Sequence, residues 1–216
     1  MIRYSIIKKL SLTVLLSVLP LNIVLAQSTP TVTNDATPTE NNDAALISPV
    51  TQIDYAPLRI LLATQQWRQA NEKTIELLLQ ATGRAKQGWI PPETLKKISC
   101  WDLKTIDDLW REYSNNRFGF SVQFPYFIET GNRPGRLVDV EAYQRFGDRV
   151  GWRRNGDWVV FKEDLNFSLD APAGHLPAPR QEYQFAGGRL EYTTLAQTMV
   201  SCGIVTYTPP QPSVIP

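Results

Sequence analysis

Histidine, cysteine and methionine are scarce in this 216-residue chain, which has one histidine, two cysteines and two methionines. His175 has no second histidine beside it, and the cysteines lack the spacing of a zinc site. The chain also lacks a Gly-x-Ser-x-Gly elbow, a Walker loop and a dinucleotide-binding glycine motif. These absences predict a protein that is not an enzyme, with no catalytic residues, no metal site and no covalent cofactor.

The acidic side chains offer little alternative chemistry. Asp107 and Asp108 are adjacent, so in a helix they point to different sides and suit solvation better than acid–base catalysis. A hydrolase that acts through Asp148 or His175 is therefore the weaker hypothesis.

An excess of charge of one sign is also lacking. The 22 basic and 21 acidic residues give a formal net charge of +1, without a run of five or more basic residues. The first 26 residues hold three basic residues and no acidic one, so the remaining chain has 19 basic and 21 acidic residues, a net charge of −2. Such a chain lacks the basic surface that nucleic acids require, and we expect no nucleic-acid partner.

One long hydrophobic run is present, at the N-terminus. Three basic residues precede an apolar run from Leu10 to Ala26, which ends in small residues at the positions that signal peptidase reads. This pattern predicts a secretory signal peptide over residues 1–26. We expect an exported protein of the periplasm or the thylakoid lumen, without a membrane span after cleavage. An uncleaved signal that anchors the protein in the membrane is the alternative.

Composition divides the remainder into three parts. Residues 27–52 are rich in Thr, Asn, Asp and Pro and have no apolar periodicity, which predicts a disordered linker. Residues 207–216 contain four prolines and are predicted to form a disordered tail. Between them, residues 53–206 are long enough for one folded domain, which we expect to be a monomer.

Helical spacing of apolar residues predicts that this domain is mainly α, with short extended pieces in its loops, one of them at Trp158–Phe161. Gly83, Asn115–Asn116, Gly147 and Gly203 are predicted to end helices. The helices are predicted to begin at Pro57, to span 67–82, to begin at Pro91–Pro92, to follow a Thr105 cap, to span 136–146 and to follow a Thr194–Gln197 capping box.

The two cysteines, Cys100 and Cys202, have two interpretations. They pair if the protein reaches an oxidising compartment, or they remain two buried thiols beside apolar residues.

Three segments combine aromatic or apolar residues with glycine and, in one case, with several arginines: 118–123, 146–153 and 171–177. The first two place glycine where it does not suit a helix interior. Each segment alone is typical of ordinary packing at helix ends.

In their order and spacing, segments across residues 55–203 resemble the genomes-uncoupled tetrapyrrole-binding domain family. This family is known for an accessory protein of magnesium chelatase, which regulates chlorophyll biosynthesis in photosynthetic organisms. The matching segments are Leu58 to Thr74, 77–81, 88–90, Cys100, 102–103, 105–107, 109–110, 113–114, 117–123, 150–152 and 174–177.

The resemblance implies an all-helical domain shaped like a cupped hand, which binds protoporphyrin or magnesium protoporphyrin in a concave apolar surface and does not catalyse. A porphyrin is a flat apolar disc with carboxylates at one edge, so its site needs aromatic walls and cations. A loop after Pro177 is expected to close over it, although this chain lacks the family's Asn-Ala-Leu-Arg-like stretch there. In the family the His175 segment is structural. The predicted ligand-binding residues are Phe118, Phe120, Trp152, Trp158, Phe161, Arg180, Phe185 and Arg189.

Export separates this protein from magnesium chelatase, which is cytoplasmic or stromal. We therefore expect a carrier, shield or sensor of a tetrapyrrole outside the cytoplasm, with a protein partner still to be identified. The alternative is a protein-interaction module of the same fold that has lost pigment binding.

Overall fold

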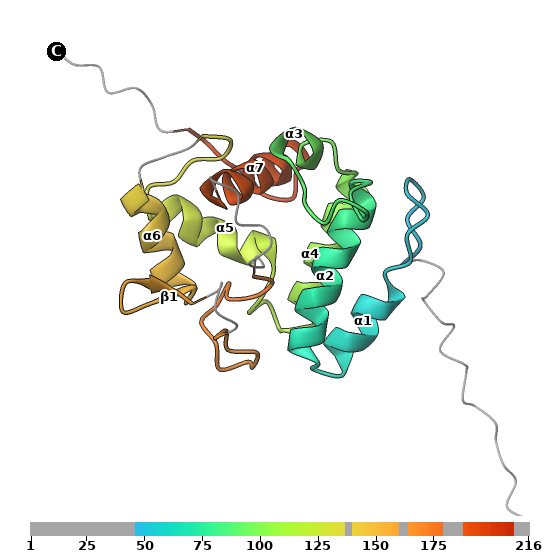
Figure 1. The fold of residues 1–216 in the computed structure, drawn as a ribbon, viewed down its shortest axis with the longest axis horizontal. Helices are drawn as coiled ribbons and strands as arrows, with labels where there is room; N and C mark the ends of the chain where they lie inside the picture. The colour runs from blue at the N-terminus through green and yellow to red at the C-terminus, as the bar shows by residue number, and fades with distance from the viewer. Residues whose placement is uncertain (1–45, 137–139, 160–163, 179–187, 210–216) are drawn as a thin grey trace, which may run out of the picture. The chain divides into compact units, whose positions relative to one another are not determined.

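A computed structural model describes residues 46–136, 140–159, 164–178 and 188–209. Within these ranges the chain forms seven helices and one two-stranded antiparallel sheet (Figure 1), which confirms the mainly α class. The predicted signal peptide, residues 1–26, lies outside the described residues. The elements are α1 (Ala56–Ala63), α2 (Trp67–Ala81), α3 (Pro92–Leu95), α4 (Cys100–Tyr113), α5 (Phe120–Glu129), α6 (Val140–Arg149), β1 (Arg153–Arg154), β2 (Asp157–Trp158) and α7 (Gly188–Ser201).

The first two helices form where the apolar spacing predicts them. Pro57 lies in the first turn of α1, where a missing N–H costs nothing, and Leu58 and Leu62 are buried one turn apart. Helix α2 ends before Gly83, whose φ of +67° is the left-handed conformation that glycine adopts most readily. Both helices pack against α4.

Helix α4 begins earlier than predicted. Ser99 is its N-cap, and the Ser99 hydroxyl accepts a hydrogen bond from the backbone N–H of Asp102 at 3.4 Å. Thr105 therefore lies inside the helix, and the predicted Thr105 cap is wrong. The predicted end is confirmed, because Asn115 and Asn116 both adopt positive φ after Tyr113.

Helix α5 is absent from the sequence-based prediction. Gly119 before it and Pro125 inside it both look like helix breakers. A neighbouring helix provides the cap, because the Asp107 carboxylate accepts a hydrogen bond from the N–H of Ser121 at 2.8 Å. Gly119 has a φ of +133°, and a Cβ there would lie 2.9 Å from Cγ of Arg111.

The boundaries of the last two helices also differ from the prediction. Helix α6 continues through Gly147, where a Cβ would lie 2.5 Å from the Trp158 ring; the glycine thus serves close packing and does not end the helix. Arg136, the predicted start of this helix, instead forms an isolated bridge with Arg133. Thr194 lies well inside α7, so the predicted capping box is wrong, whereas Gly203 follows the helix with a φ of +66°.

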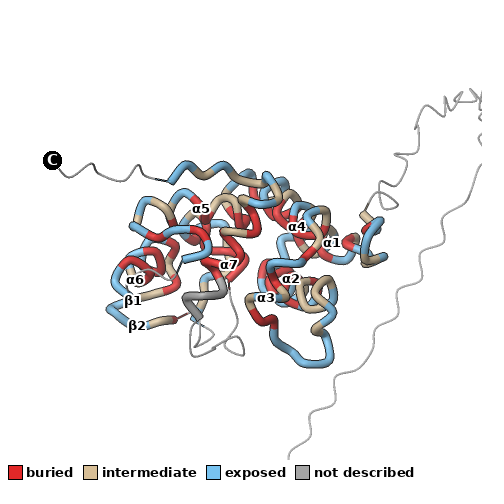
Figure 2. The backbone as a smooth tube through the Cα atoms, turned by 90° about the horizontal axis from the view of Figure 1, so that it is seen from above, coloured by how far each residue is buried: buried red, intermediate tan, exposed pale blue. Residues whose placement is uncertain are grey.

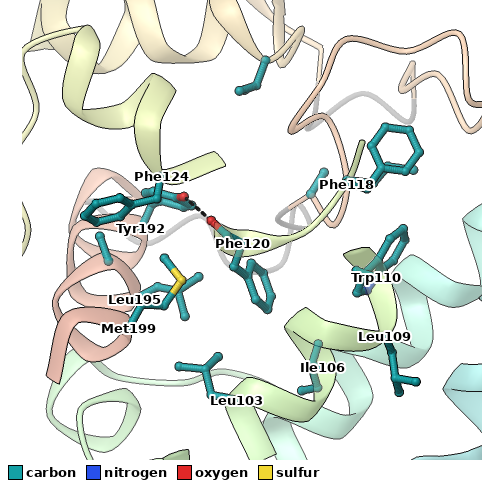
Figure 3. Packing of buried hydrophobic residues seen from close by; sticks show 14 of the residues in the cluster. Leu103, Ile106, Leu109, Trp110, Phe118, Phe120, Phe124, Tyr192, Leu195 and Met199 are labelled. Atoms are coloured by element: carbon teal, nitrogen blue, oxygen red, sulfur yellow. Dashed lines mark hydrogen bonds between the residues drawn. The ribbon is translucent and has the colours of Figure 1, made fainter. Parts of the chain in front are cut away.

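The core lies where the helices face one another (Figure 2). Figure 3 shows Phe120 between α4, which contributes Leu103 and Ile106, and α7, which contributes Leu195 and Met199. Burying each large apolar side chain contributes about 1.5–3 kcal/mol, so this contact is a main link between the two helices.

The predicted linker ends in ordered structure, and the predicted tail begins in ordered structure. Thr51 and Tyr55 each donate a hydrogen bond to the same Asp102 oxygen, at 3.0 and 2.9 Å, so the linker predicted over residues 27–52 is too long at its C-terminal end. Tyr207, predicted in the tail, packs edge-on against Phe124 at 6.5 Å. The folded domain is thus longer at both ends than its composition indicates.

Cys100 and Cys202 form a disulfide with a Cα–Cα distance of 5.3 Å. The bridge joins the first residue of α4 to the residue that follows α7. Of the two interpretations of these cysteines, the paired one is correct. Among the helices of the described ranges, none combines the length and the apolar composition needed to cross a bilayer.

Candidate functional site

Two of the predicted wall residues, Phe118 and Phe120, lie in the core. Phe118 is fully buried between Trp67 and Trp110, with ring centroids at 5.6 and 6.2 Å. Phe120 is 5% exposed and points between α4 and α7 (Figure 3). These rings therefore support the neighbouring surface from behind and do not form an open wall.

The two predicted wall residues at the hairpin formed by β1 and β2 differ from each other in burial. Trp152 is fully buried, lies at 5.3 Å from Phe146, and donates its indole N–H to the carbonyl oxygen of His175 at 2.8 Å. Trp158 in β2 is half-buried and lies at 5.5 Å from the Tyr143 ring. Of the four predicted aromatic walls that the structure describes, only Trp158 reaches the surface.

The side chains of the other predicted ligand residues lie outside the part of the chain that the structure describes. Phe161, Arg180 and Phe185 lie outside the described residues. Arg189 is the second residue of α7, at a position where only the backbone is described. These four residues remain predictions.

The 174–178 segment is held by hydrogen bonds with α2, with α5 and with Gly119, the residue that precedes α5. The N–H of Gly119 donates to the carbonyl of Leu176 at 2.9 Å, and the Gln123 side chain donates to the carbonyl of Pro177 at 2.8 Å. The N–H of Ala178 donates to the Asn71 side chain of α2 at 2.7 Å. The chain is therefore fixed immediately before residue 179.

His175 has a structural role. Its Nδ1 lies 2.7 Å from the carbonyl oxygen of Val150, and its Nε2 accepts a hydrogen bond from the N–H of Asn166 at 3.2 Å. The Val150 carbonyl can only accept, so Nδ1 carries the proton. Burial lowers the pKa of His175 and keeps the ring neutral. Neither nitrogen is left for a metal, and the described residues contain no cluster of three potential metal ligands.

Helix α7 is held in its N-terminal half by two contacts. The hydroxyl of Tyr192 donates to the carbonyl of Phe120 at 3.2 Å, and burial raises the pKa of Tyr192. The N–H of Gly135 donates to the carbonyl of Thr193 at 2.8 Å. The chain is thus fixed shortly before residue 179 and again a few residues after the start of α7.

Two arginine–tryptophan pairs lie in two separate segments, the α2–α3 connection and the β1–β2 hairpin. In the α2–α3 connection, Trp89 is 37% exposed, and the Arg84 guanidinium stacks over its ring at 4.6 Å while donating to the Trp89 carbonyl at 3.1 Å. In the hairpin, the Arg153 guanidinium lies 5.5 Å from the Trp158 ring. Figure 2 shows α7 between the hairpin and the α2–α3 connection. We call these two pairs, together with α7, the α7 face.

The sequence-based site omitted Arg84 and Trp89. The signal was present, because Gly88-Trp89 places glycine next to an aromatic residue close to an arginine, the same combination that marked other segments. The spacing of residues alone does not show which part of the fold this connection lies next to.

Asp107 and Asp108 differ in their exposure to solvent. Asp108 pairs with Lys104 at the surface. Asp107 is fully buried, so the prediction that both carboxylates are solvated is wrong. Burial raises the pKa of Asp107, although the hydrogen bonds from Ser121 oppose this shift. Its role in the structure is to cap α5.

A separate groove of about 600 Å³ lies where α4 ends and α5 begins. None of the predicted ligand-binding residues lines it. The lining residues are Arg111, Asn116, Ser121, Val122, Phe124, Pro125, Ile204, Val205 and Thr206.

The fold and this arrangement define a class of protein: a mainly helical domain in which the segment that ends at Ala178 and the last helix, α7, are each hydrogen-bonded to neighbouring elements. The model of the GUN4-like family matches residues 49–191. The chain therefore belongs to the GUN4-like family.

Relatives and solved structures agree with this assignment. The chain is 31% identical over 131 residues to the Ycf53-like protein of Synechocystis, covering 60% of this chain and 52% of that protein. It is 34% identical over 127 residues to the chloroplastic tetrapyrrole-binding protein of Arabidopsis thaliana, covering 54% and 44%. The chain thus spans about half the length of the curated relatives it matches.

The GUN4 structure from Chlamydomonas reinhardtii matches with a TM-score of 0.58 and 28% identity, over 70% of this chain and 89% of that one. The ligand-free structure of Arabidopsis thaliana GUN4 matches with a TM-score of 0.54 and 29% identity, over 66% and 93%. These matches confirm the helical fold.

Proposed function

We propose that this protein binds a tetrapyrrole, protoporphyrin or magnesium protoporphyrin, at the α7 face without transforming it, as a carrier, shield or sensor. The observation that carries the proposal is membership of the GUN4-like family, together with the relative that is named a tetrapyrrole-binding protein. The single histidine, His175, is buried with both ring nitrogens hydrogen-bonded, so it is not available as a general base.

The α7 face suits this ligand chemically. Trp89 and Trp158 offer aromatic surface for a flat apolar disc, and Arg84 and Arg153 bring guanidinium groups close to it. Arg153 already pairs with Asp148 at 2.8 Å, so Arg84 is the better partner for a propionate. Both ring nitrogens of His175 are hydrogen-bonded within the protein, so His175 would not be available to a magnesium in the ring.

A titration of the protein with protoporphyrin tests this function. We expect a shifted Soret band and quenched tryptophan fluorescence at micromolar ligand, and a weaker affinity in Arg84→Ala, by roughly tenfold for a charge-assisted contact of about 1.5 kcal/mol. Arg111→Ala, which removes an exposed arginine at the separate groove, is the matched control. Arg180→Ala and Arg189→Ala extend the test to the predicted lid. A protein that leaves both signals unchanged does not have this function.

Export is part of the proposal. The N-terminal sequence pattern supports it, and so does the Cys100–Cys202 bridge, because disulfides persist mainly in oxidising compartments. The compartment is then the periplasm or the thylakoid lumen. N-terminal sequencing of the protein from its native cells should find Gln27 first; a chain that retains residues 1–26 would instead be anchored.

The alternative is a protein-interaction module that has lost its pigment. Two observations favour it: three predicted wall residues are core side chains, and the groove at Arg111 lies apart from the α7 face. In that case Arg111→Ala weakens binding to a protein partner, Arg84→Ala does not, and protoporphyrin leaves the spectra unchanged.

A further inference from the structure

The Cys100–Cys202 disulfide is attached to the helix that forms the middle of the α7 face. Cys202 follows the last residue of α7 directly, and Cys100 is the first residue of α4. The bridge therefore fixes the C-terminal end of α7 to the start of α4, and Figure 2 shows α7 between the hairpin and the α2–α3 connection, the two segments that hold the arginine–tryptophan pairs. A single helix thus connects the disulfide to the proposed ligand site.

The contacts along α7 join this helix to its neighbours. Leu195 and Met199 pack against Phe120, and the Tyr192 hydroxyl donates to the Phe120 carbonyl at 3.2 Å (Figure 3). The carbonyl of Thr193 accepts from Gly135 at 2.8 Å. These contacts link α7 to the start of α5 and to the turn at Gly135.

The bridge is accessible to a reductant. Cys100 is exposed and Cys202 is half-buried. Cys100 also occupies the first position of a 14-residue helix, where the partial positive charge of the helix N-terminus stabilises a thiolate. A stabilised thiolate is a good leaving group in thiol–disulfide exchange.

We propose that the Cys100–Cys202 bridge is an exchange site for a dithiol reductant, and that its reduction weakens tetrapyrrole binding at the α7 face. The second half of this proposal rests on the proposed function.

The exchange proceeds in two balanced steps. A thiolate of the dithiol attacks Sγ of Cys202, the Cys100–Cys202 bond breaks, and Cys100 leaves as a thiolate. The second thiol of the reductant, as its thiolate, then attacks the first sulfur of the reductant, which is bonded to Sγ of Cys202 in the mixed disulfide. The Cys202 thiolate is released. The dithiol loses two electrons and becomes a cyclic or internal disulfide, and its two protons pass to the two cysteines of this chain.

The test compares protoporphyrin binding by the full chain in its oxidised state and after incubation with dithiothreitol, with circular dichroism to verify that the reduced chain is folded. Energetic coupling between sites changes affinity by roughly 5–150-fold, so we expect the dissociation constant to rise at least about fivefold on reduction. Cys100→Ser/Cys202→Ser should bind like the reduced protein and not respond to dithiothreitol.

A second measurement uses only the native chain, so it does not depend on whether the double variant folds. Linkage is reciprocal, so protoporphyrin must shift the dithiothreitol equilibrium of the bridge toward the disulfide by the same factor. A bridge that dithiothreitol does not reduce in the folded protein, or an equilibrium that porphyrin leaves unchanged, overturns the redox proposal while pigment binding stands. No Soret shift with the oxidised protein overturns the proposed function and this inference with it.

Discussion

Removal of the Cys100–Cys202 bridge will destabilise the domain by an amount that follows from the length of the loop it closes. The bridged residues are 102 positions apart. In the chain-entropy model, a loop of this length corresponds to about 4.7 kcal/mol at 25 °C, which is an upper estimate because denatured chains keep some structure. For a domain of about 160 residues this is a fall of roughly 14 °C in Tm.

The assay is urea denaturation of the oxidised protein and of Cys100→Ser/Cys202→Ser, followed by tryptophan fluorescence. The midpoint should fall in the variant, and the oxidised protein treated with dithiothreitol should unfold at the midpoint of the variant. Ser201→Ala, an exposed change next to Cys202, is the control and should stay within about 0.5 kcal/mol of the parent. A loss below about 1 kcal/mol would refute the loop-entropy reasoning and show that the unbridged chain is already constrained between α4 and α7.

Three further predictions concern single side chains. Asp107→Asn keeps an acceptor for the Ser121 N–H and removes a buried charge, so it should be at least as stable as the parent at pH 7. Burial raises the folded-state pKa of Asp107, so the parent loses stability as the pH rises from about 4 through that pKa, and the variant lacks this loss. Urea midpoints of both proteins at pH 4, 5.5 and 7 measure the difference. A variant that is less stable than the parent at pH 7 would contradict this reasoning. Gly147→Ala places a Cβ 2.5 Å from the Trp158 ring and should cost about 1–3 kcal/mol in the same assay, whereas Glu141→Ala, an exposed change in the same helix, should cost less than about 0.5. Phe118→Leu should cost about 1–1.5 kcal/mol and leave protoporphyrin affinity unchanged, since the ring is packed between Trp67 and Trp110; a large loss of affinity would restore Phe118 as a ligand wall.

The sequence by itself determined the helical class and the family resemblance. Helices α1 and α2 form where leucine spacing places one apolar face, and Gly83 and Gly203 end helices in the left-handed conformation that favours glycine. These features are local: each depends on residues within one or two turns, so the pattern of a single segment contains the information.

The tertiary structure decided the features that depend on residues far apart in the chain. Helix α5 begins after Gly119 because Asp107, on another helix, supplies its cap. Gly147 resembles a helix end but lies inside α6, because the Trp158 ring packs against it.

The same holds for the candidate site. Phe118 and Trp152 carry the composition of a ligand wall, yet only the packing shows that both rings are buried. Arg84 and Trp89 belong to the α7 face because the α2–α3 connection carries them there, and no local sequence pattern predicts the path of this connection. The bridge between Cys100 and Cys202 depends on where α4 begins and where α7 ends. Burial and proximity depend on which helix faces pack together in the folded domain. The spacing of apolar residues in one segment shows which face of that helix is apolar, but it does not show which other element packs against that face.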